Sequence, residues 1–265
     1  MNADSYMVKG DTHDVCQDFA LAGIVAGSGY ALLSDGCSSS CDVDLGARLL
    51  AHGALDRLRS CLLADRDFDP VSLAKEAINK AALAISHFSN IEKAALDATL
   101  LLAVLRPDGR LRICAWGDGA VLVRQGDAVQ AFLLHYVKNA PFYLSYSLDA
   151  GRLANFKAAG GGRLSVESLG NAKELVLCPS SPLEPFVVDL ALAPGDAAVL
   201  VTDGLGQFVD QDNQSISWER LVPDFLSYKQ TQGTFLRRRL NFFFRQNRSQ
   251  NVRHLDDVSA AALIL

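Results

Sequence analysis

An aspartate followed by a glycine ends two strongly apolar segments of the chain, and this repeated pair constrains the fold more than any other feature. The first segment ends in Asp35-Gly36 and the second in Asp203-Gly204. Each segment is rich in leucine or valine, which predicts a buried strand, and the glycine then lets the chain turn sharply. A carboxylate held at such a strand end, with no basic residue next to it in sequence, is costly unless a cation binds it. The pair therefore predicts two buried strands that end at a metal site.

Turn residues divide much of the chain into short strands and paired helices. Residues 18–35 are a hairpin candidate; if Val25 faces Tyr30 across the turn, Asp18 and Asp35 become diagonal neighbours on one face. Helices are expected at about 45–63, 70–88, 218–228 and 233–246, and further strands at 98–105, 111–116, 121–124, from 128 onward, and at 174–178, 186–190, 197–202 and 258–265. Short turns favour antiparallel sheets, and the helical pairs are large enough to cover a sheet face. We expect an α+β sandwich formed by a single domain, residues 1–265.

Residues 133–172 stand apart because their pattern is weak. They contain Pro141, three consecutive glycines at 160–162, and the tyrosines Tyr136, Tyr143 and Tyr146. A stretch of this length without a clear period is typical of a surface loop or lid. We expect a flap-like excursion whose tyrosines either line the approach of a substrate or pack in the core.

The composition limits the partners and the compartment. Thirty acidic residues against 25 basic ones give a net charge of −5, which argues against nucleic acid as a partner. No run approaches the roughly 18 apolar residues that cross a bilayer, and the first residues do not resemble a secretory leader. The six cysteines are scattered, so we expect reduced thiols, no membrane partner and a cytoplasmic protein. Cys37 and Cys41 lack the second close pair that a zinc site needs.

Other aspartates occupy comparable positions. Asp18 begins a predicted strand, Asp256 and Asp257 precede the last one, and Asp118 lies between two glycines. Oxygen ligands with few or no histidines suit Mg²⁺ or Mn²⁺. Aspartate is also common in ordinary turns, so the set is more informative than any single member.

Six short motifs follow one another along nearly the whole chain. They are Cys16-Gln17-Asp18-Phe19, Asp35-Gly36, Asp97-Ala98-Thr99-Leu100-Leu101, Gly117-Asp118-Gly119, Thr202-Asp203-Gly204-Leu205 and Asp256-Asp257-Val258-Ser259. In this order they resemble the metal-dependent protein phosphatases, the protein phosphatase 2C family. Gly10 and His13 before the first motif are similar to a bacterial branch of that family. The resemblance implies a four-layer α-β-β-α sandwich, with two antiparallel sheets between helical pairs.

The resemblance also implies a centre of two Mg²⁺ or Mn²⁺ ions. A water activated by the ions would attack the phosphorus of phosphoserine or phosphothreonine on a protein substrate. Asp35 would bridge both ions and Gly36 would offer its carbonyl to one of them. Asp203 and Asp256 would complete the shell of one ion. The sequence leaves the choice between Mg²⁺ and Mn²⁺ open.

Three further residues receive roles from the resemblance. Asp18 would act on the second ion, largely through water, and Asp118 would help to hold a weaker third ion. Asp257 stands where the family usually has Asn, so it would support the ligands rather than bind an ion. The partner implied is a phosphorylated protein, and we expect the chain to be a monomer.

Four positions depart from the family pattern. His13 stands where an arginine usually binds the substrate phosphate; a protonated imidazole could still contact the phosphate, less firmly than a bidentate arginine. Gln17 replaces a glutamate. Cys37 replaces a histidine proposed as general acid, and Gln207 replaces an aspartate that would serve a third ion. An active phosphoserine/phosphothreonine phosphatase is therefore our first hypothesis. A catalytically weak regulatory module that binds a phosphorylated partner, and a hydrolase of small phosphate esters, remain as alternatives.

Overall fold

The computed structural model describes the backbone of residues 1–265 and every side chain except those of residues 171–174. The strands are β1 (Asn2–Val8), β2 (Asp18–Val25), β3 (Ser28–Asp35), β4 (Leu100–Leu105), β5 (Arg110–Trp116), β6 (Gly119–Gln125), β7 (Ala128–Tyr136), β8 (Leu164–Ser168), β9 (Asn171–Leu177), β10 (Phe186–Ala191), β11 (Ala197–Val201), β12 (Phe208–Val209), β13 (Arg253–His254) and β14 (Val258–Ile264). The helices are α1 (Val43–Leu63), α2 (Pro70–Ile85), α3 (Ala150–Ala158), α4 (Val222–Leu226) and α5 (Phe235–Ser249).

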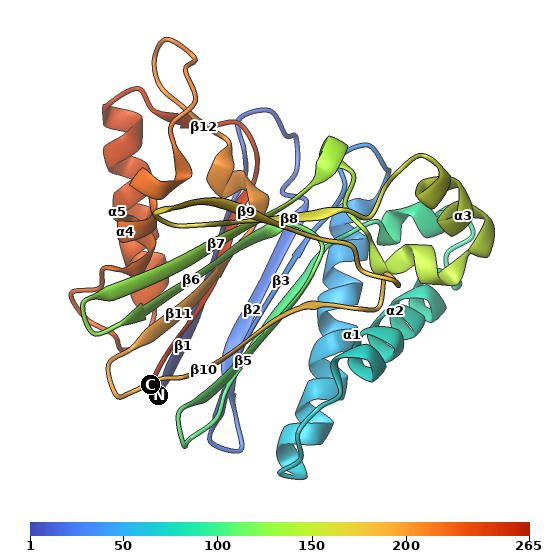
Figure 1. The fold of residues 1–265 in the computed structure, drawn as a ribbon, viewed down its shortest axis with the longest axis horizontal. Coiled ribbons are helices and arrows are strands. Elements are labelled where there is room, and N and C mark those ends of the chain that lie inside the picture. The colour runs from blue at the N-terminus through green and yellow to red at the C-terminus, as the bar shows by residue number, and fades with distance from the viewer.

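Two antiparallel sheets lie face to face between helical layers, which confirms the expected α+β sandwich (Figure 1). One sheet has the order β10-β5-β4-β3-β2 and the other has the order β1-β14-β11-β6-β7-β8-β9. Buried side chains such as Leu33, Leu101, Val121 and Leu200 fill the space between the sheets. Strands with apolar residues on both faces are expected where a sheet is covered on both sides.

The β2–β3 hairpin has a different register from the one expected. Val25 pairs with Ser28 rather than with Tyr30, because a two-residue turn with positive φ at both positions joins the strands. Asp18 consequently lies directly opposite Asp35 and not diagonal to it. The error of two residues keeps every side chain on its predicted face, since the side-chain period of a strand is two.

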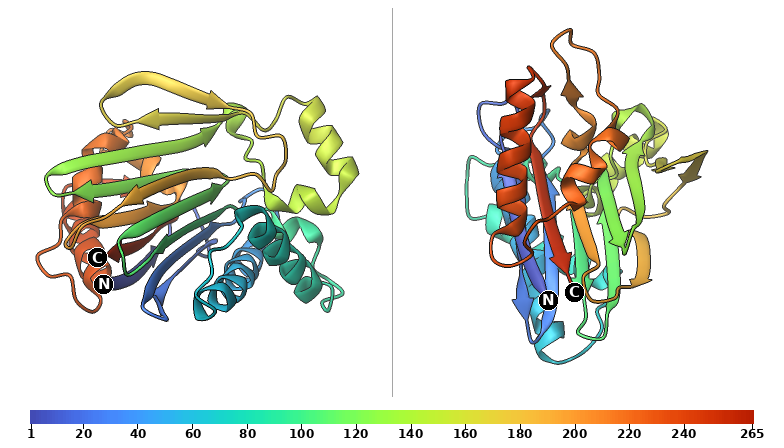
Figure 2. Two further views of the ribbon diagram at one scale, coloured as in Figure 1. Left: turned by 60° about the horizontal axis from the view of Figure 1, so that its bottom comes forward. Right: turned by 90° about the vertical axis from the view of Figure 1, so that its left-hand side faces the viewer.

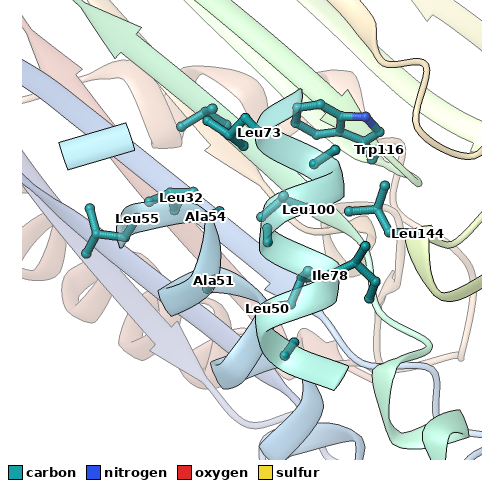
Figure 3. Packing of buried hydrophobic residues seen from close by; sticks show 14 of the residues in the cluster. Leu32, Leu50, Ala51, Ala54, Leu55, Leu73, Ile78, Leu100, Trp116 and Leu144 are labelled. Atoms are coloured by element: carbon teal, nitrogen blue, oxygen red, sulfur yellow. The ribbon is translucent and has the colours of Figure 1, made fainter. Parts of the chain in front are cut away.

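Helices α1 and α2 cover the five-stranded sheet. Helix α2 begins where the sequence predicts, because the Asp69 carboxylate accepts a hydrogen bond of 2.8 Å from the Ser72 amide and Pro70 occupies the first turn. Figure 3 shows leucine and isoleucine side chains from the helices packed against Leu32, Leu100 and Trp116 of the sheet. Burial of this apolar surface fixes the outer helical layer to the sheet.

Helices α4 and α5 cover the seven-stranded sheet on the opposite side, as the second view in Figure 2 shows. Strand β1, which the sequence did not predict, pairs along its whole length with β14, from Asn2 opposite Ile264 to Val8 opposite Val258. The two ends of the chain therefore lie side by side. All six cysteines are free. Among the helices described, none is both long and apolar enough to cross a membrane.

The weakly patterned stretch 133–172 contains more regular structure than expected. Strand β7 continues to Tyr136, and β8 and β9 extend the seven-stranded sheet. The side chains at 171–174, in the last part of the stretch, lie outside the described ones. The chain leaves the sheet only between β7 and β8, where it forms a short 3₁₀ helix, Leu144–Leu148, followed by α3. We call residues 137–163 the excursion. Stacked rings of Phe142, Tyr146 and Phe156 hold it together.

Candidate metal centre

The strand ends that the sequence analysis predicted to bind metal meet at one end of the sandwich, around a cavity of about 270 Å³. The predicted site residues that line it are His13, Asp35, Gly36, Asp118, Asp203 and Asp256. They come from both sheets, because Asp35 ends β3 in one sheet whereas Asp203 and Asp256 flank β11 and β14 in the other. Asp18 does not line the cavity; it is buried directly opposite Asp35 on β2.

Burial and mutual repulsion raise the pKa values of these carboxyl groups. Loss of hydration raises the pKa of Asp118 to about 8, and the charge of Asp203 adds to the effect. Burial raises the pKa of Asp18 to about 7 and that of Asp256 to about 6. The pKa of Asp35 lies well above its usual value, first because of burial and then because of the charge of Asp18. Gathering the ionised groups here without a cation is therefore unfavourable.

The oxygen atoms left without partners suit a divalent cation. Asp18 Oδ1 and Asp203 Oδ1 are buried and make no hydrogen bond. A buried carboxylate oxygen without a donor is costly, and hard cations such as Mg²⁺ and Mn²⁺ are bound through such oxygens. Among the described side chains, no three Asp, Glu, His or Cys groups have the spacing of a formed metal site. Ionised carboxylates repel one another when no cation lies between them.

Thr99 explains how the third motif supports Asp35. Its hydroxyl accepts a hydrogen bond of 3.0 Å from the Asp35 amide, and its own amide donates to the Asp35 carbonyl at 2.8 Å. The Ser34 hydroxyl donates to the Thr99 carbonyl at 2.7 Å. These bonds fix the end of β3 against the start of β4, so the backbone of the proposed bridging residue is held from both sides.

Thr202 connects the two sheets beneath the cavity. Its hydroxyl donates to Asp18 Oδ2 at 2.9 Å and accepts from the Ser259 amide at 2.9 Å. The glycine of the second Asp-Gly pair has a steric role, since a Cβ at Gly204 would lie 1.9 Å from the carbonyl oxygen of Asp257. The backbone after Asp203 therefore packs directly on the strand start that carries Asp256.

Asp257 organises the segment that precedes β2. It is buried, and its carboxylate accepts hydrogen bonds from the amides of Gly10 at 2.7 Å and Gln17 at 2.6 Å. His13 lines the cavity, but Nδ1 of its ring lies 3.0 Å from Asp257 and Nε2 lies 3.6 Å from Asp256. Both ring nitrogens thus face carboxylates, which leaves the imidazole less free to contact a phosphate than the sequence indicated.

Other departures from the family pattern also have a structural setting. Cys37 lines the cavity beside Tyr143, and burial together with the neighbouring thiol raises the pKa of the Tyr143 hydroxyl. The backbone carbonyl of Gln207 accepts a bond of 3.0 Å from the Leu255 amide. No Lys or Arg is among the described residues that line the cavity. The site therefore offers hydroxyl and amide donors, but no guanidinium, to a bound phosphate.

Sequence reasoning missed Asn139 and left open whether Tyr143 lines the substrate approach; both residues belong to the excursion. Asn139, Pro141 and Tyr143 form part of the cavity wall. The tyrosines of this segment were the only available signal, and they did not distinguish a substrate approach from a packed core. A larger hollow of about 410 Å³ lies beside α5 and β13, but Asp11 is the only carboxylate among the described residues that line it. The predicted site aspartates therefore gather in the smaller cavity.

Comparisons with known proteins agree with the motifs and the fold. The model of the protein phosphatase 2C family matches residues 10–146. No curated protein matches the sequence significantly. The photosystem II phosphatase PBCP shares 14% identity over 99% of this chain and 98% of its own, with a TM-score of 0.59. The Mycobacterium tuberculosis serine/threonine phosphatase PstP/Ppp shares 16% identity over 99% and 97% of the two chains, with a TM-score of 0.56.

A structure of the catalytic domain of the serine/threonine phosphatase PstP in complex with two manganese ions is also similar, with 14% identity over 98% and 96% of the two chains and a TM-score of 0.51. At these identities the likeness concerns the fold alone. The family match is more specific, since it spans about half of the chain and includes Asp18, Asp35 and Asp118. The sequence match and the four-layer fold together show that this chain belongs to the protein phosphatase 2C family.

Proposed function

We propose that the chain hydrolyses phosphoserine or phosphothreonine on protein substrates with the help of Mg²⁺ or Mn²⁺. One observation carries the proposal: carboxylates from both sheets converge on one cavity, with Asp118 buried and Asp35, Asp203 and Asp256 partly buried, and Asp18 and Asp203 each keep a buried oxygen without a hydrogen bond. A protein without metal chemistry gains nothing from such costly burial. The manganese bound to PstP supports this choice of cofactor for a related fold.

Asp35, Asp203, Asp256 and the carbonyl of Gly36 would hold two ions, with Asp18 acting on one of them largely through water. When bound, the ions would lower the pKa of a water molecule and neutralise the phosphate. Asp118 lies on the same cavity wall and would serve a third, weaker ion.

The remaining cavity residues would bind and orient the phosphate group. Ser38, Ser39 and the Asn139 amide line the cavity and can donate hydrogen bonds to phosphate oxygens. Because no arginine stands beside them among the described lining residues, phosphate binding would depend strongly on the ions. With Cys37 in place of an imidazole, the leaving oxygen would take its proton from water. Turnover would then be roughly 10² to 10⁴-fold slower than with a histidine as general acid.

The second candidate is a catalytically weak module that recognises a phosphorylated partner. The position of the His13 ring favours it, since both nitrogens face Asp256 and Asp257 rather than open cavity. The buried oxygens of Asp18 and Asp203 that lack a hydrogen bond, and the raised pKa of Asp35, favour the enzyme. We further propose that residues 1–265 act as one domain and as a monomer.

Hydrolysis assays separate these candidates. Release of phosphate from a phosphothreonine peptide and from p-nitrophenyl phosphate would be measured with Mg²⁺, Mn²⁺ or EDTA for the wild type and for Asp35→Asn and Asp203→Asn. Asp127→Asn is the matched control, because it removes one carboxylate at an exposed turn. The enzyme requires ion-dependent release that both site variants lose and the control keeps. Release that persists in Asp203→Asn would exclude the proposed centre, and turnover of p-nitrophenyl phosphate without any turnover of the peptide would favour a small substrate.

A further inference from the structure

Asp97, which begins the third motif, is a buried carboxylate with a set of partners that the proposed metal chemistry does not use. Its side chain is only 8% exposed. Oδ1 accepts a hydrogen bond of 2.5 Å from the Ser145 hydroxyl, and Oδ2 accepts one of 2.7 Å from Arg152 Nη2. Both partners belong to the excursion. A buried carboxylate with a guanidinium and a hydroxyl as donors is stable only while that segment stays in place.

The same residue also holds the opposite wall of the cavity. The Asp97 carbonyl accepts a hydrogen bond of 2.8 Å from the Cys37 amide, and its Oδ2 lies 3.4 Å from the Ser40 hydroxyl that donates to it. Cys37 and the two serines after it line the cavity. Asp97 is therefore bonded to the loop on one side of the cavity and to the excursion on the other.

Contacts within the excursion connect Arg152, which binds Asp97, to the residues that form the cavity wall. The Arg152 guanidinium lies 5.0 Å from the centre of the Tyr146 ring, and that ring stacks on Phe156 at 4.5 Å. Phe142 stacks on Phe156 at 5.1 Å, and its neighbour Tyr143 lines the cavity. Stacked rings move together because their contact area is large. A displacement of α3 would therefore also displace the wall that includes Tyr143.

We propose that Asp97 is a positioning residue: through Arg152 it fixes the excursion against the loop 37–40, and so sets the width of the cavity mouth for a phosphorylated peptide. The peptide as ligand rests on the phosphatase function proposed above. The attachment itself rests only on the contacts of Asp97. A small ester would occupy only the cavity itself, whereas a peptide would extend past its mouth along the excursion, so small esters would be less affected than a peptide.

The leading test is Arg152→Met, which removes the charge but keeps an unbranched apolar side chain over Tyr146. We expect a KM for the phosphothreonine peptide about tenfold higher or more, because one charge-assisted hydrogen bond is lost. The KM for p-nitrophenyl phosphate and kcat should change much less. Arg152→Lys should restore part of the effect. Asp97→Asn, which replaces the acceptor Oδ2 by a donor or turns it away, should act in the same direction.

Hydrogen exchange tests the attachment without any activity. In Arg152→Met the amides of residues 140–150 should lose protection by about tenfold or more, while β4 and β11 keep theirs. Arg112→Met is the matched control, because it removes an arginine bonded to Asp189 at 2.7 Å and 3.0 Å on the exposed face of β5 and β10. Arg112→Met should change neither the KM for the peptide nor the exchange protection of residues 140–150.

The outcomes separate this proposal from the phosphatase function. Unchanged exchange in both Arg152→Met and Asp97→Asn would overturn the attachment whether or not the protein is an enzyme. Altered exchange with equal effects on the KM of peptide and small ester would overturn the role in peptide binding. Ion-dependent turnover lost in Asp203→Asn, together with an unaffected peptide KM in Arg152→Met, would leave the function intact and reject Asp97 as the positioning residue. Mn²⁺ binding, measured by calorimetry, should be the same in Arg152→Met and the wild type.

Discussion

Without divalent ions, the folded protein should lose stability as the pH rises from about 4 to about 8. Asp118 shows why: burial raises the pKa of its carboxyl from 3.8 to about 8, so the folded state holds this proton more tightly than the unfolded chain does. The stabilising effect is complete below the unfolded value and disappears as the pH passes the folded value. A shift of about four pKa units corresponds to on the order of 5 kcal/mol in the free energy of unfolding.

The assay is urea unfolding in EDTA at pH 5, 6.5 and 8 for the wild type and for Asp118→Asn. Asparagine cannot ionise, so the variant should be more stable than the wild type by only about 1 to 2 kcal/mol at pH 5 and by several kcal/mol at pH 8. Asp127→Asn at an exposed turn controls for the loss of one negative charge from a chain of net charge −5. Saturating Mn²⁺ should reverse the trend, because the ions bind the ionised carboxylates.

Two results would refute this reasoning. A wild-type stability in EDTA that is constant or rises between pH 5 and pH 8 would mean that the carboxylates are not buried together as described. An equal pH dependence in Asp118→Asn and Asp127→Asn would mean that the trend comes from the overall negative charge and not from the cavity.

Three further predictions concern the residues that support the centre. Thr202→Val should lower the free energy of unfolding by roughly 2 to 4 kcal/mol in urea titrations, because it removes a hydrogen bond to Asp18 and one from the Ser259 amide. Thr202→Ser keeps the hydroxyl and should retain most of the wild-type stability. Gly204→Ala should prevent folding or lower the free energy of unfolding by more than about 3 kcal/mol, since its Cβ would lie 1.9 Å from a backbone oxygen. Gly206 has open space around it, so Gly206→Ala should lower this free energy by under about 1 kcal/mol in thermal unfolding. Mn²⁺ at a hundred times its Kd should raise the free energy of unfolding by about 2.7 kcal/mol in calorimetry, and chelation should remove this gain.

The fold could be predicted from sequence where local patterns are strong. The apolar strands, the capped start of α2 at Asp69 and Pro70, and the turns between β4 and β7 all carry local signals. Strand β1 carries none, because its residues are only half-buried and its identity as a strand depends on pairing with β14 more than 200 residues away. Hairpin register was wrong by two residues because a sequence does not show which turn positions take positive φ.

The order of the aspartates in the sequence predicted the candidate site. It did not predict the hydrogen bonds and ion pairs that hold these residues in place. The motifs predicted that their aspartates meet, and one cavity is indeed lined by Asp35, Asp118, Asp203 and Asp256. The bonds of Asp97 to Arg152 and Ser145 join segments that are about 50 residues apart, and no local pattern predicts them. The contacts of the His13 ring with two carboxylates are likewise a product of tertiary packing.

The pairing of β1 with β14 has a consequence for the order of assembly. Strand β14 is an inner strand of its sheet, between β1 and β11, although it follows all the other strands of this fold in chain order. Until it inserts, β1 has no partner in the sheet and Asp256 is far from the other carboxylates. The seven-stranded sheet and the cavity are therefore complete only after this long-range pairing, which forms slowly because a large loop must close first. A chain shortened before Val258 should bind no Mn²⁺ at this centre, whatever helical structure it retains.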